Sequence, residues 1–86
     1  MKQIGNPWYV YMLRCADDSL YTGITKDISR RVDEHNNGQA AGASYTRSRR
    51  PVTVVYQETC TTRSQAAKRE YTIKQMSRQE KQSLIK

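Results

Sequence analysis

The residues best suited to chemistry in this sequence are two tyrosine-containing triplets and three basic side chains that follow them. The triplets are Tyr9-Val10-Tyr11 and Tyr21-Thr22-Gly23, and the basic residues are Lys26, Arg31 and His35. The triplets lie in two segments predicted to be paired strands, and the basic residues follow on the predicted next helix. This order brings phenols, a guanidinium and an imidazole into one neighbourhood. Such a set is suited to handling a phosphate group.

Tyr11 and Tyr21 are candidates for proton transfer if both rings point to the same face of the hairpin. The unperturbed pKa of a tyrosine is about 10. Positive charge from Lys26, Arg31 and a bound metal would favour the phenolate, which could act as a base for an attacking water. Alternatively, both rings belong to the strand core, with hydrogen-bonded hydroxyls. Gly23 permits a close approach of another group to the strand backbone.

Arg31 and His35 are spaced i, i+4, so they stand one above the other on the predicted helix. The guanidinium could bind a phosphate through two hydrogen bonds and stabilise a phosphodiester transition state. Alternatively, Arg31 pairs with Asp27 at the surface. His35 could carry a proton or donate to a phosphate, since its unperturbed pKa is about 6.5. Alternatively, it is a favourable charge at the helix C-terminus.

Glu70 is the most unusual placement of a charged residue. It falls between two members of an apolar helical stripe formed by Ala66, Ala67 and Ile73. A carboxylate that faces inward is costly unless it is paired or bound to a metal. Glu70 is therefore either an edge residue, ion-paired with Lys74 or Arg31, or a ligand for a hard cation. Mg²⁺ is typically held by one or two carboxylates together with waters and phosphate oxygens, so one glutamate can suffice.

The segment from Gln39 to Arg50 is predicted to be a long loop, because its residues are small and show no apolar periodicity. Its second half carries one stacking ring and three phosphate-binding side chains: Tyr45, Arg47, Arg49 and Arg50. This combination is typical of polyanion binding. We therefore predict that these four residues contact DNA.

The elements that must position these residues follow from sequence periodicity. In chain order, we predict strands at Trp8–Leu13 and Leu20–Ile24, a helix at Ile28–Asn36, a strand at Val52–Cys60, a helix from Thr62 to about Met76 and a short helix after Ser77. Two capping boxes start the last two helices. In the first strand, one face carries Tyr9, Tyr11 and Leu13, and the other carries Trp8, Val10 and Met12. Ile28 and Val32 fix the inward side of the first helix.

Composition limits the chain to one small domain, residues 1–86 with a core of about 7–86. Residues 1–46 carry five basic and five acidic side chains, whereas residues 47–86 carry ten basic and three acidic, so the whole net charge of +7 lies in the second half. This asymmetry favours a polyanionic partner. There is no run of roughly 18 apolar residues and no signal-peptide pattern, which predicts a cytoplasmic protein without a membrane span. Cys15 and Cys60 are expected to be reduced thiols.

The order and spacing of these residues resemble the GIY-YIG nuclease domain, over roughly Pro7 to Lys86. The similarity is to the small single-domain members of the family, also called URI-domain proteins. It includes the two triplets, Lys26, Arg31 eight residues after Gly23, His35 four residues later, and Glu70 in a distal helix. Tyr9 and Val10 stand where the family name has Gly and Ile, Thr22 stands where it has Ile, and Gln82 stands where many members have asparagine.

The resemblance implies an α+β fold, a three-stranded antiparallel sheet flanked by helices, and metal-dependent cleavage of a DNA phosphodiester. It assigns the motif tyrosines to Tyr11 and Tyr21, the motif glycine to Gly23, the helix arginine to Arg31 and the adjacent histidine to His35. The metal-binding glutamate would be Glu70, and Lys26 would support the site electrostatically. Most nucleases of the family carry a further DNA-binding domain, which is not seen in this sequence.

Our sequence-based hypothesis is a DNA endonuclease that uses one Mg²⁺ or Mn²⁺ ion. We expect it to select branched or damaged DNA by structure, or to cut without sequence preference, with a role in repair or recombination and a protein partner that supplies specificity. One alternative is a non-catalytic nucleic-acid-binding module with the same fold. Another is an adaptor whose basic face contacts a protein.

Overall fold

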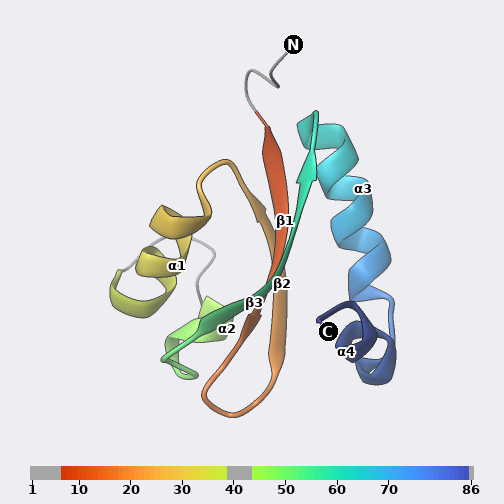
Figure 1. Cartoon of the computed structure of the whole chain (residues 1–86). Coiled ribbons are helices and arrows are strands. Elements are labelled where there is room, and N and C mark those ends of the chain that lie inside the picture. The colour runs from red at the N-terminus through yellow and green to blue at the C-terminus, as the bar shows by residue number, and fades with distance from the viewer. Residues whose placement is uncertain (1–6, 39–43, 86) are drawn as a thin grey trace.

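The structure, a computed structural model, describes residues 7–38 and 44–85. In chain order it contains β1 (Trp8–Arg14), β2 (Leu20–Thr25), α1 (Ile28–Asn37), α2 (Ser44–Arg47), β3 (Thr53–Cys60), α3 (Arg63–Lys74) and α4 (Arg78–Ile85) (Figure 1). The predicted α+β class is confirmed. The predicted order of strands and longer helices is also confirmed, with α2 as an addition.

The prediction of an irregular loop from Gln39 to Arg50 is wrong for its second half. Residues 39–43 lie outside the described residues, but Ser44–Arg47 forms α2. The backbone N–H of Arg49 donates to the carbonyl of Thr46 at 2.9 Å and closes the turn that follows. A helix of four residues is too short to show the apolar periodicity from which longer helices are predicted.

The sheet has β1 at its centre, with β2 and β3 antiparallel on either side. Tyr11 is paired with Gly23 on β2 and with Gln57 on β3. The pairing with β3 shifts between Met12 and Leu13, where an irregularity interrupts the register. Because β2 is an edge strand, side chains that cross it from β1 reach the rim of the sheet.

The turn between β1 and β2 joins several parts of the chain. The carboxylate of Asp17 accepts a hydrogen bond from the backbone N–H of Ser19 at 3.0 Å, and Asp18 adopts the left-handed conformation with φ of 71°. Asp17 also pairs with Arg49 at 3.1 Å, and the backbone carbonyl of Asp18 accepts from Arg78 at 2.9 Å. The two aspartates therefore tie the α2–β3 connection and the start of α4 to the same hairpin.

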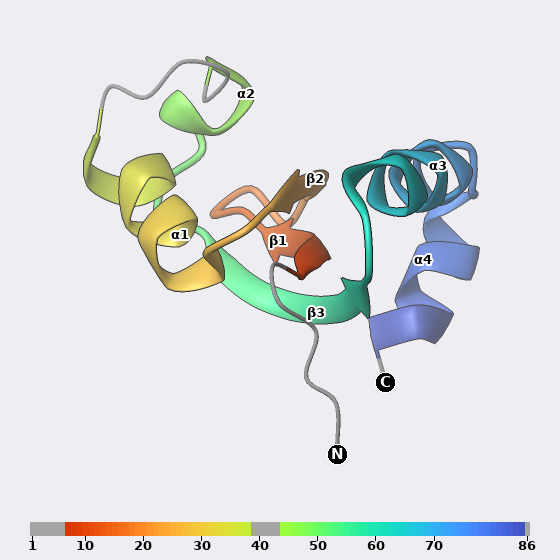
Figure 2. The ribbon, with the colours of Figure 1, turned by 90° about the horizontal axis from the view of Figure 1, so that it is seen from above.

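Helices cover both faces of the sheet (Figure 2): α1 and α2 lie on one side, and α3 and α4 lie on the other. The core under α3 and α4 is built on the buried residues Val10, Met12, Cys60, Ala66 and Ile73. The core under α1 is built on the buried residues Tyr11, Leu13, Cys15 and Val52. The alternation predicted for β1 is therefore confirmed.

The first helix begins and packs as its sequence predicts. Asp27 caps α1, because its Oδ1 accepts a hydrogen bond from the backbone N–H of Arg30 at 3.1 Å. Ile28 and Val32 pack against the core under α1. These contacts fix the rotation of α1, and therefore the direction in which its polar residues point.

The two predicted capping boxes differ in detail. Ser77 and Glu80 are reciprocal: the backbone N–H of Ser77 donates to Glu80 Oε1 at 2.8 Å, and that of Glu80 donates to Ser77 Oγ at 3.1 Å. At the start of α3, the N–H of Gln65 donates to Thr62 Oγ1 at 3.1 Å, but Gln65 Oε1 accepts from Thr61 at 2.9 Å. Both helix starts are nevertheless capped.

Two limits expected from composition concern membranes and thiols. Within residues 7–38 and 44–85, none of the helices has the length and apolar character needed to cross a bilayer. Cys15 and Cys60 are buried free thiols, and they belong to the cores on opposite faces of the sheet. Each therefore acts as a small core residue.

A close approach between β1 and β2 explains the glycine at position 23. A Cβ atom added to Gly23 would lie 2.7 Å from the hydroxyl oxygen of Tyr11 and 2.9 Å from its Cζ. Only a residue without a side chain leaves room for the phenol to cross β2. Gly23 therefore sets the position of the Tyr11 hydroxyl.

We expect Gly23→Ala to lower the free energy of unfolding by about 2 kcal/mol, because the added methyl group overpacks a buried site. Thermal or denaturant unfolding measures the effect. Tyr11→Ala provides the matched background, since it removes the ring that the methyl group would strike. If Gly23→Ala costs as much in that background as in the wild type, the clash with Tyr11 is not the cause.

Candidate active site

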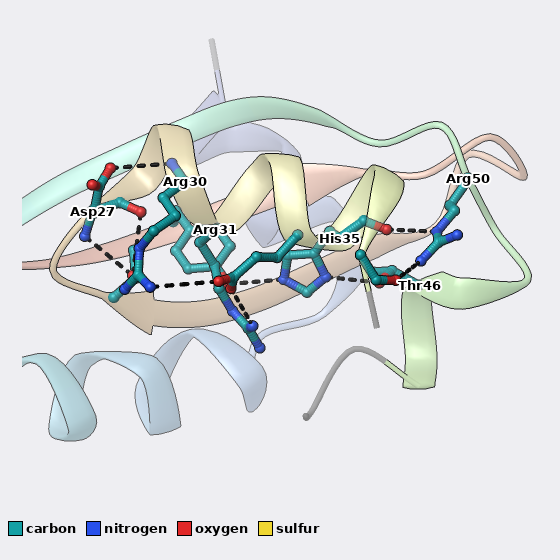
Figure 3. Close-up of polar contacts among 10 residues, drawn as sticks. Asp27, Arg30, Arg31, His35, Thr46 and Arg50 are labelled. Carbon is teal, nitrogen blue, oxygen red and sulfur yellow. Dashed lines mark hydrogen bonds and ion pairs between the residues drawn. The ribbon is translucent and has the colours of Figure 1, made fainter. Parts of the chain in front are cut away.

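A polar cluster forms where the Tyr11 ring crosses β2. Tyr11 comes from β1, Arg31 and His35 come from α1, and Thr46 comes from α2. Figure 3 shows these contacts running along α1, from Asp27 before its first turn to Thr46 beside its last. Residues separated by more than thirty positions in the sequence thus meet in one hydrogen-bonded cluster.

The phenol of Tyr11 is buried, with 1% of the residue exposed. Its hydroxyl lies 3.1 Å from His35 Nε2 and also forms a hydrogen bond with Arg31. Burial, reinforced by the nearby Tyr21, raises the pKa of Tyr11 to about 12, although Arg31 opposes the change. Arg31 therefore favours the phenolate, as expected, but burial outweighs its effect in the protein alone.

His35 is fully buried between β1 and α2. Its Nδ1 lies 2.7 Å from Thr46 Oγ1, while its Nε2 faces Tyr11. Burial, with a smaller effect from Arg31, lowers the pKa of His35 below its ordinary value, although Glu34 opposes the change. The alternative of a favourable charge at the helix C-terminus is not supported, because His35 is buried and its pKa is lowered. Position in the sequence did not indicate that Thr46 would join the cluster.

Arg31 is directed at the cluster, and its side chain is 19% exposed. Its Nη1 pairs with Glu34 Oε1 at 3.0 Å. The ion pair considered from the sequence, with Asp27 one turn before Arg31, is therefore replaced by one with Glu34, one turn after it. Burial alone would lower the pKa of Arg31, but Glu34 and Tyr11 together hold it above its ordinary value. The guanidinium therefore stays charged between a buried phenol and solvent.

Glu70 approaches the cluster from α3, on the opposite side of the sheet. It acts electrostatically on Tyr11 and raises the pKa of that phenol slightly. The carboxylate is 23% exposed and pairs with Lys74 Nζ at 3.1 Å, which is one of the two ion pairs considered from the sequence. Ala66 is buried but Ala67 is exposed, so the apolar stripe is narrower than predicted and Glu70 lies at its edge.

Glu70 is the candidate ligand for a metal ion. Within residues 7–38 and 44–85, no group of three or more histidine, cysteine, aspartate or glutamate side chains could hold an ion. One partly exposed glutamate nevertheless fits a Mg²⁺-type ion that takes its other ligands from water and phosphate oxygens. Glu70 meets this requirement once Lys74 moves away.

Aromatic rings extend from the cluster to the surface. Tyr21 lies with its ring centroid 5.2 Å from that of His35 and 6.4 Å from that of Tyr11. The ring centroid of Tyr45 lies 5.6 Å from that of Tyr21, and Tyr45 is 38% exposed. The guanidinium carbon of Arg49 lies over the Tyr45 ring, 4.2 Å from its centroid. Tyr11 and Tyr21 therefore share one face of the hairpin, which is the condition on which their candidate role in proton transfer depends.

Lys26, predicted to support the site, lies beside Trp8 and makes none of the contacts described for the cluster. Its Nζ lies 5.5 Å from the centre of the Trp8 ring, and Arg63 approaches the same ring at 5.6 Å. Lys26 also borders an open cavity of about 310 Å³ at the start of α1, which is lined by Tyr9, Asp27, Ile28, Ser29 and Gln57 as well. None of Tyr11, Arg31, His35 or Glu70 lines that cavity.

The three arginines predicted to bind DNA have different surroundings. Arg50 is half-buried and donates from Nε to the carbonyl of His35 at 2.7 Å and from Nη2 to the carbonyl of Gly38 at 2.6 Å. Arg49 is held by Asp17 and by the carbonyl of Tyr45. Arg47 is exposed. Arg50 therefore anchors the end of α1, whereas Arg47 presents its charge to solvent.

This chain belongs to the GIY-YIG family: the family model described as "GIY-YIG catalytic domain" matches residues 7–83. Among its relatives, UPF0213 protein DP2720 of Desulfotalea psychrophila is 61% identical over 79 residues, which are 92% of this chain and 71% of that protein. UPF0213 protein SSP2268 of Staphylococcus saprophyticus is 58% identical over 77 residues, 90% of this chain and 92% of that protein.

A solved structure agrees with the architecture. The solution NMR structure of the UPF0213 protein BH0048 from Bacillus halodurans is similar with a TM-score of 0.58 and 40% identity, covering 92% of this chain and 82% of that one. The resemblance stated from the two triplets is therefore confirmed at the level of the family and the fold, and the family is one of nucleases.

The high pKa of Tyr11 makes folding sensitive to alkaline pH. Its folded pKa of about 12 lies above the unfolded value of about 10, so its contribution to stability is complete below pH ~10 and is lost as the pH rises through ~12. We expect the free energy of unfolding to fall more steeply over this range in the wild type than in Tyr11→Phe. Denaturant titrations at several pH values measure this fall in the free energy of unfolding.

Tyr71→Phe, at an exposed site, is the control and should follow the wild type. If the free energy of unfolding falls as steeply with pH in Tyr11→Phe as in the wild type, the assignment to Tyr11 is contradicted.

The different surroundings of Arg50 and Arg47 predict different effects on stability. Arg50→Ala should lower the free energy of unfolding by about 2–3 kcal/mol, because it removes two charge-assisted hydrogen bonds to carbonyls. Arg47→Ala is the matched control and should change it by less than about 0.5 kcal/mol. Denaturant unfolding compares them, and equal effects would show that Arg50 does not anchor α1.

Proposed function

We propose that this chain is a metal-dependent DNA endonuclease that hydrolyses phosphodiester bonds. The observation that carries the proposal is the convergence of Tyr11, Arg31 and His35 in one buried hydrogen-bonded cluster, with Glu70 acting on it across the rim of the sheet. Membership in a nuclease family and a net charge of +7 support a DNA substrate.

Arg31 would bind the scissile phosphate. Its guanidinium is partly exposed and stays charged, and in the absence of DNA it is paired with the Glu34 carboxylate. A phosphate oxygen can take the place of Glu34, because arginine donates through several N–H groups in a fixed fork. Charge that develops on the phosphate in the transition state is then stabilised by a group that is already oriented.

Tyr11 would deprotonate or position the attacking water, with Tyr21 beside it. As the water oxygen bonds to phosphorus, its proton passes to the Tyr11 oxygen and the Tyr11 proton passes to His35 Nε2 across 3.1 Å. The bond from phosphorus to the 3′ oxygen breaks, and that oxygen leaves with the electron pair. Since the pKa of Tyr11 is about 12 and that of His35 is lowered, the proton stays on Tyr11 until the water attacks.

Glu70 would hold one Mg²⁺ or Mn²⁺ ion after release from Lys74. When bound, the ion supplies positive charge to the leaving 3′ oxygen. The pairing of Glu70 with Lys74 holds the carboxylate at the edge of the sheet while no substrate is present. The contact of Arg31 with Glu34 and that of Tyr11 with His35 involve neither Glu70 nor Lys74.

DNA outside the scissile phosphate would be held by Tyr45, Arg47 and the basic surface of α3 and α4. These are contacts to backbone and to stacked bases, which carry affinity but little sequence information. We therefore expect selection by DNA structure, or none, and a protein partner where a defined target is needed. A role in repair or recombination fits such selectivity.

Nicking of supercoiled plasmid and of branched DNA, with Mg²⁺ or Mn²⁺, tests the proposal. Arg31→Ala and Glu70→Gln should each lower the cleavage rate by about 100-fold or more, as removal of a group that stabilises a transition state does. Arg30→Ala is the matched control for Arg31, since the Arg30 side chain is 68% exposed and lies next to it. Cleavage by Arg31→Ala at the wild-type rate would show that the site is assigned wrongly.

Lys74→Gln separates metal binding by Glu70 from a structural ion pair. If Glu70 acts as a ligand, the variant frees the carboxylate and retains cleavage. If Glu70 only anchors α3 through Lys74, both variants lose stability and cleavage together. Thermal unfolding of Glu70→Gln and Lys74→Gln, measured beside the nicking assay, decides between the two.

The second candidate function is a nucleic-acid-binding module without catalysis. It is favoured by the ion pair with Lys74 that occupies the Glu70 carboxylate. Both functions predict binding that weakens with salt, so binding alone does not separate them. Binding without cleavage of any DNA form, with either metal, would support the module. Failure of a filter to retain DNA or RNA at low salt would contradict both and favour an adaptor.

A further inference from the structure

Thr46 makes a contact to the cluster that family membership does not explain. It is fully buried, on a helix of only four residues whose other described side chains, Tyr45 and Arg47, are exposed. Its Oγ1 lies 2.7 Å from His35 Nδ1, shorter than the 3.1 Å between His35 Nε2 and Tyr11. The imidazole is therefore held from both sides, by β1 and by α2 (Figure 3).

The direction of each hydrogen bond follows from the donors available. Arg31 can only donate, so the Tyr11 oxygen accepts from it, and the buried Tyr11 proton is left to donate to His35 Nε2. A neutral imidazole that accepts at Nε2 carries its own proton on Nδ1. That proton is donated to Thr46 Oγ1, the acceptor 2.7 Å away.

Burial, together with the charges that face His35, keeps the ring neutral. Arg31 from α1 and Arg50 from the segment after α2 disfavour a second proton, as does burial, whereas Glu34 on α1 favours one. Tyr21 on β2 contacts the edge of the ring. The net effect lowers the pKa of His35, in agreement with a single ring proton at neutral pH.

We propose that Thr46 is a positioning residue that fixes His35 as the Nδ1–H tautomer, so that Nε2 is left to accept the proton of Tyr11. Without an acceptor at Nδ1, the imidazole can place its proton on Nε2 and donate to the Tyr11 oxygen. The Tyr11 proton then has no acceptor on His35. The effect on tautomer stands on geometry alone, whereas the effect on cleavage rests on the proposed function.

Two variants separate the hydroxyl of Thr46 from its volume. Thr46→Val keeps the branched shape and removes the acceptor, and Thr46→Ser keeps the acceptor and removes one methyl group. A residue that only fills space would be mimicked better by valine. A residue that fixes a tautomer is mimicked by serine.

The chain contains one histidine, so the ring nitrogens of His35 can be observed by ¹⁵N NMR without assignment of others. We expect wild type and Thr46→Ser to show a protonated Nδ1 and an unprotonated Nε2 at neutral pH. Thr46→Val should show a mixture of tautomers or a protonated Nε2. A wild-type spectrum with the proton on Nε2 would overturn the proposal, and this outcome holds even if Thr46→Val fails to fold. An unchanged tautomer in folded Thr46→Val would overturn it equally.

Cleavage of plasmid DNA gives the second measurement. Thr46→Val should lower the rate by about 10- to 100-fold, the loss typical of a residue that orients a reacting group through another, and Thr46→Ser should restore most of it. If the wild type does not cleave, the proposed function fails while the tautomer measurement still decides the role of Thr46. If Thr46→Val cleaves at the wild-type rate with an altered tautomer, the positioning role in catalysis is refuted.

Discussion

The burial of a phenol against an imidazole is the constraint on which this small domain depends. Two polar side chains in a core are costly unless each finds a partner, and Tyr11 and His35 provide each other with one. The pair requires a glycine on β2, a particular rotation of α1 and a short helix beyond it. Most of the first half of the chain is therefore arranged around two groups that a simple core would exclude.

Periodicity predicts the parts of this arrangement that repeat along the chain. The alternation in β1 places Tyr11 and Val10 on opposite faces, and the spacing of Ile28 and Val32 turns Arg31 and His35 towards the hairpin. These contacts depend only on the face of a strand or helix on which a residue lies. A periodic pattern of residue types is enough to reveal that face. The triplets with Arg31, His35 and Glu70 also sufficed to indicate the family.

Contacts made by single side chains across distant elements were not predictable in this way. Lys26 lies over Trp8 instead of beside the phenols, and Arg50 binds two carbonyls at the end of α1. Thr46 lies in a helix too short to carry a period. The raised pKa of Tyr11 likewise depends on how deeply the ring is buried, which charge and spacing alone do not give.

The hydrogen bonds of Arg50 also bear on how this fold tolerates changes in length. Arg50 holds the carbonyl of Gly38, and two residues earlier Asn36 exchanges two hydrogen bonds with the backbone of Val52. The last turn of α1 and the start of β3 are thus fastened directly to each other. The entropy of closing the segment between them rises only slowly as residues are added. Evolution can lengthen this segment at small cost, provided that Thr46 still reaches His35.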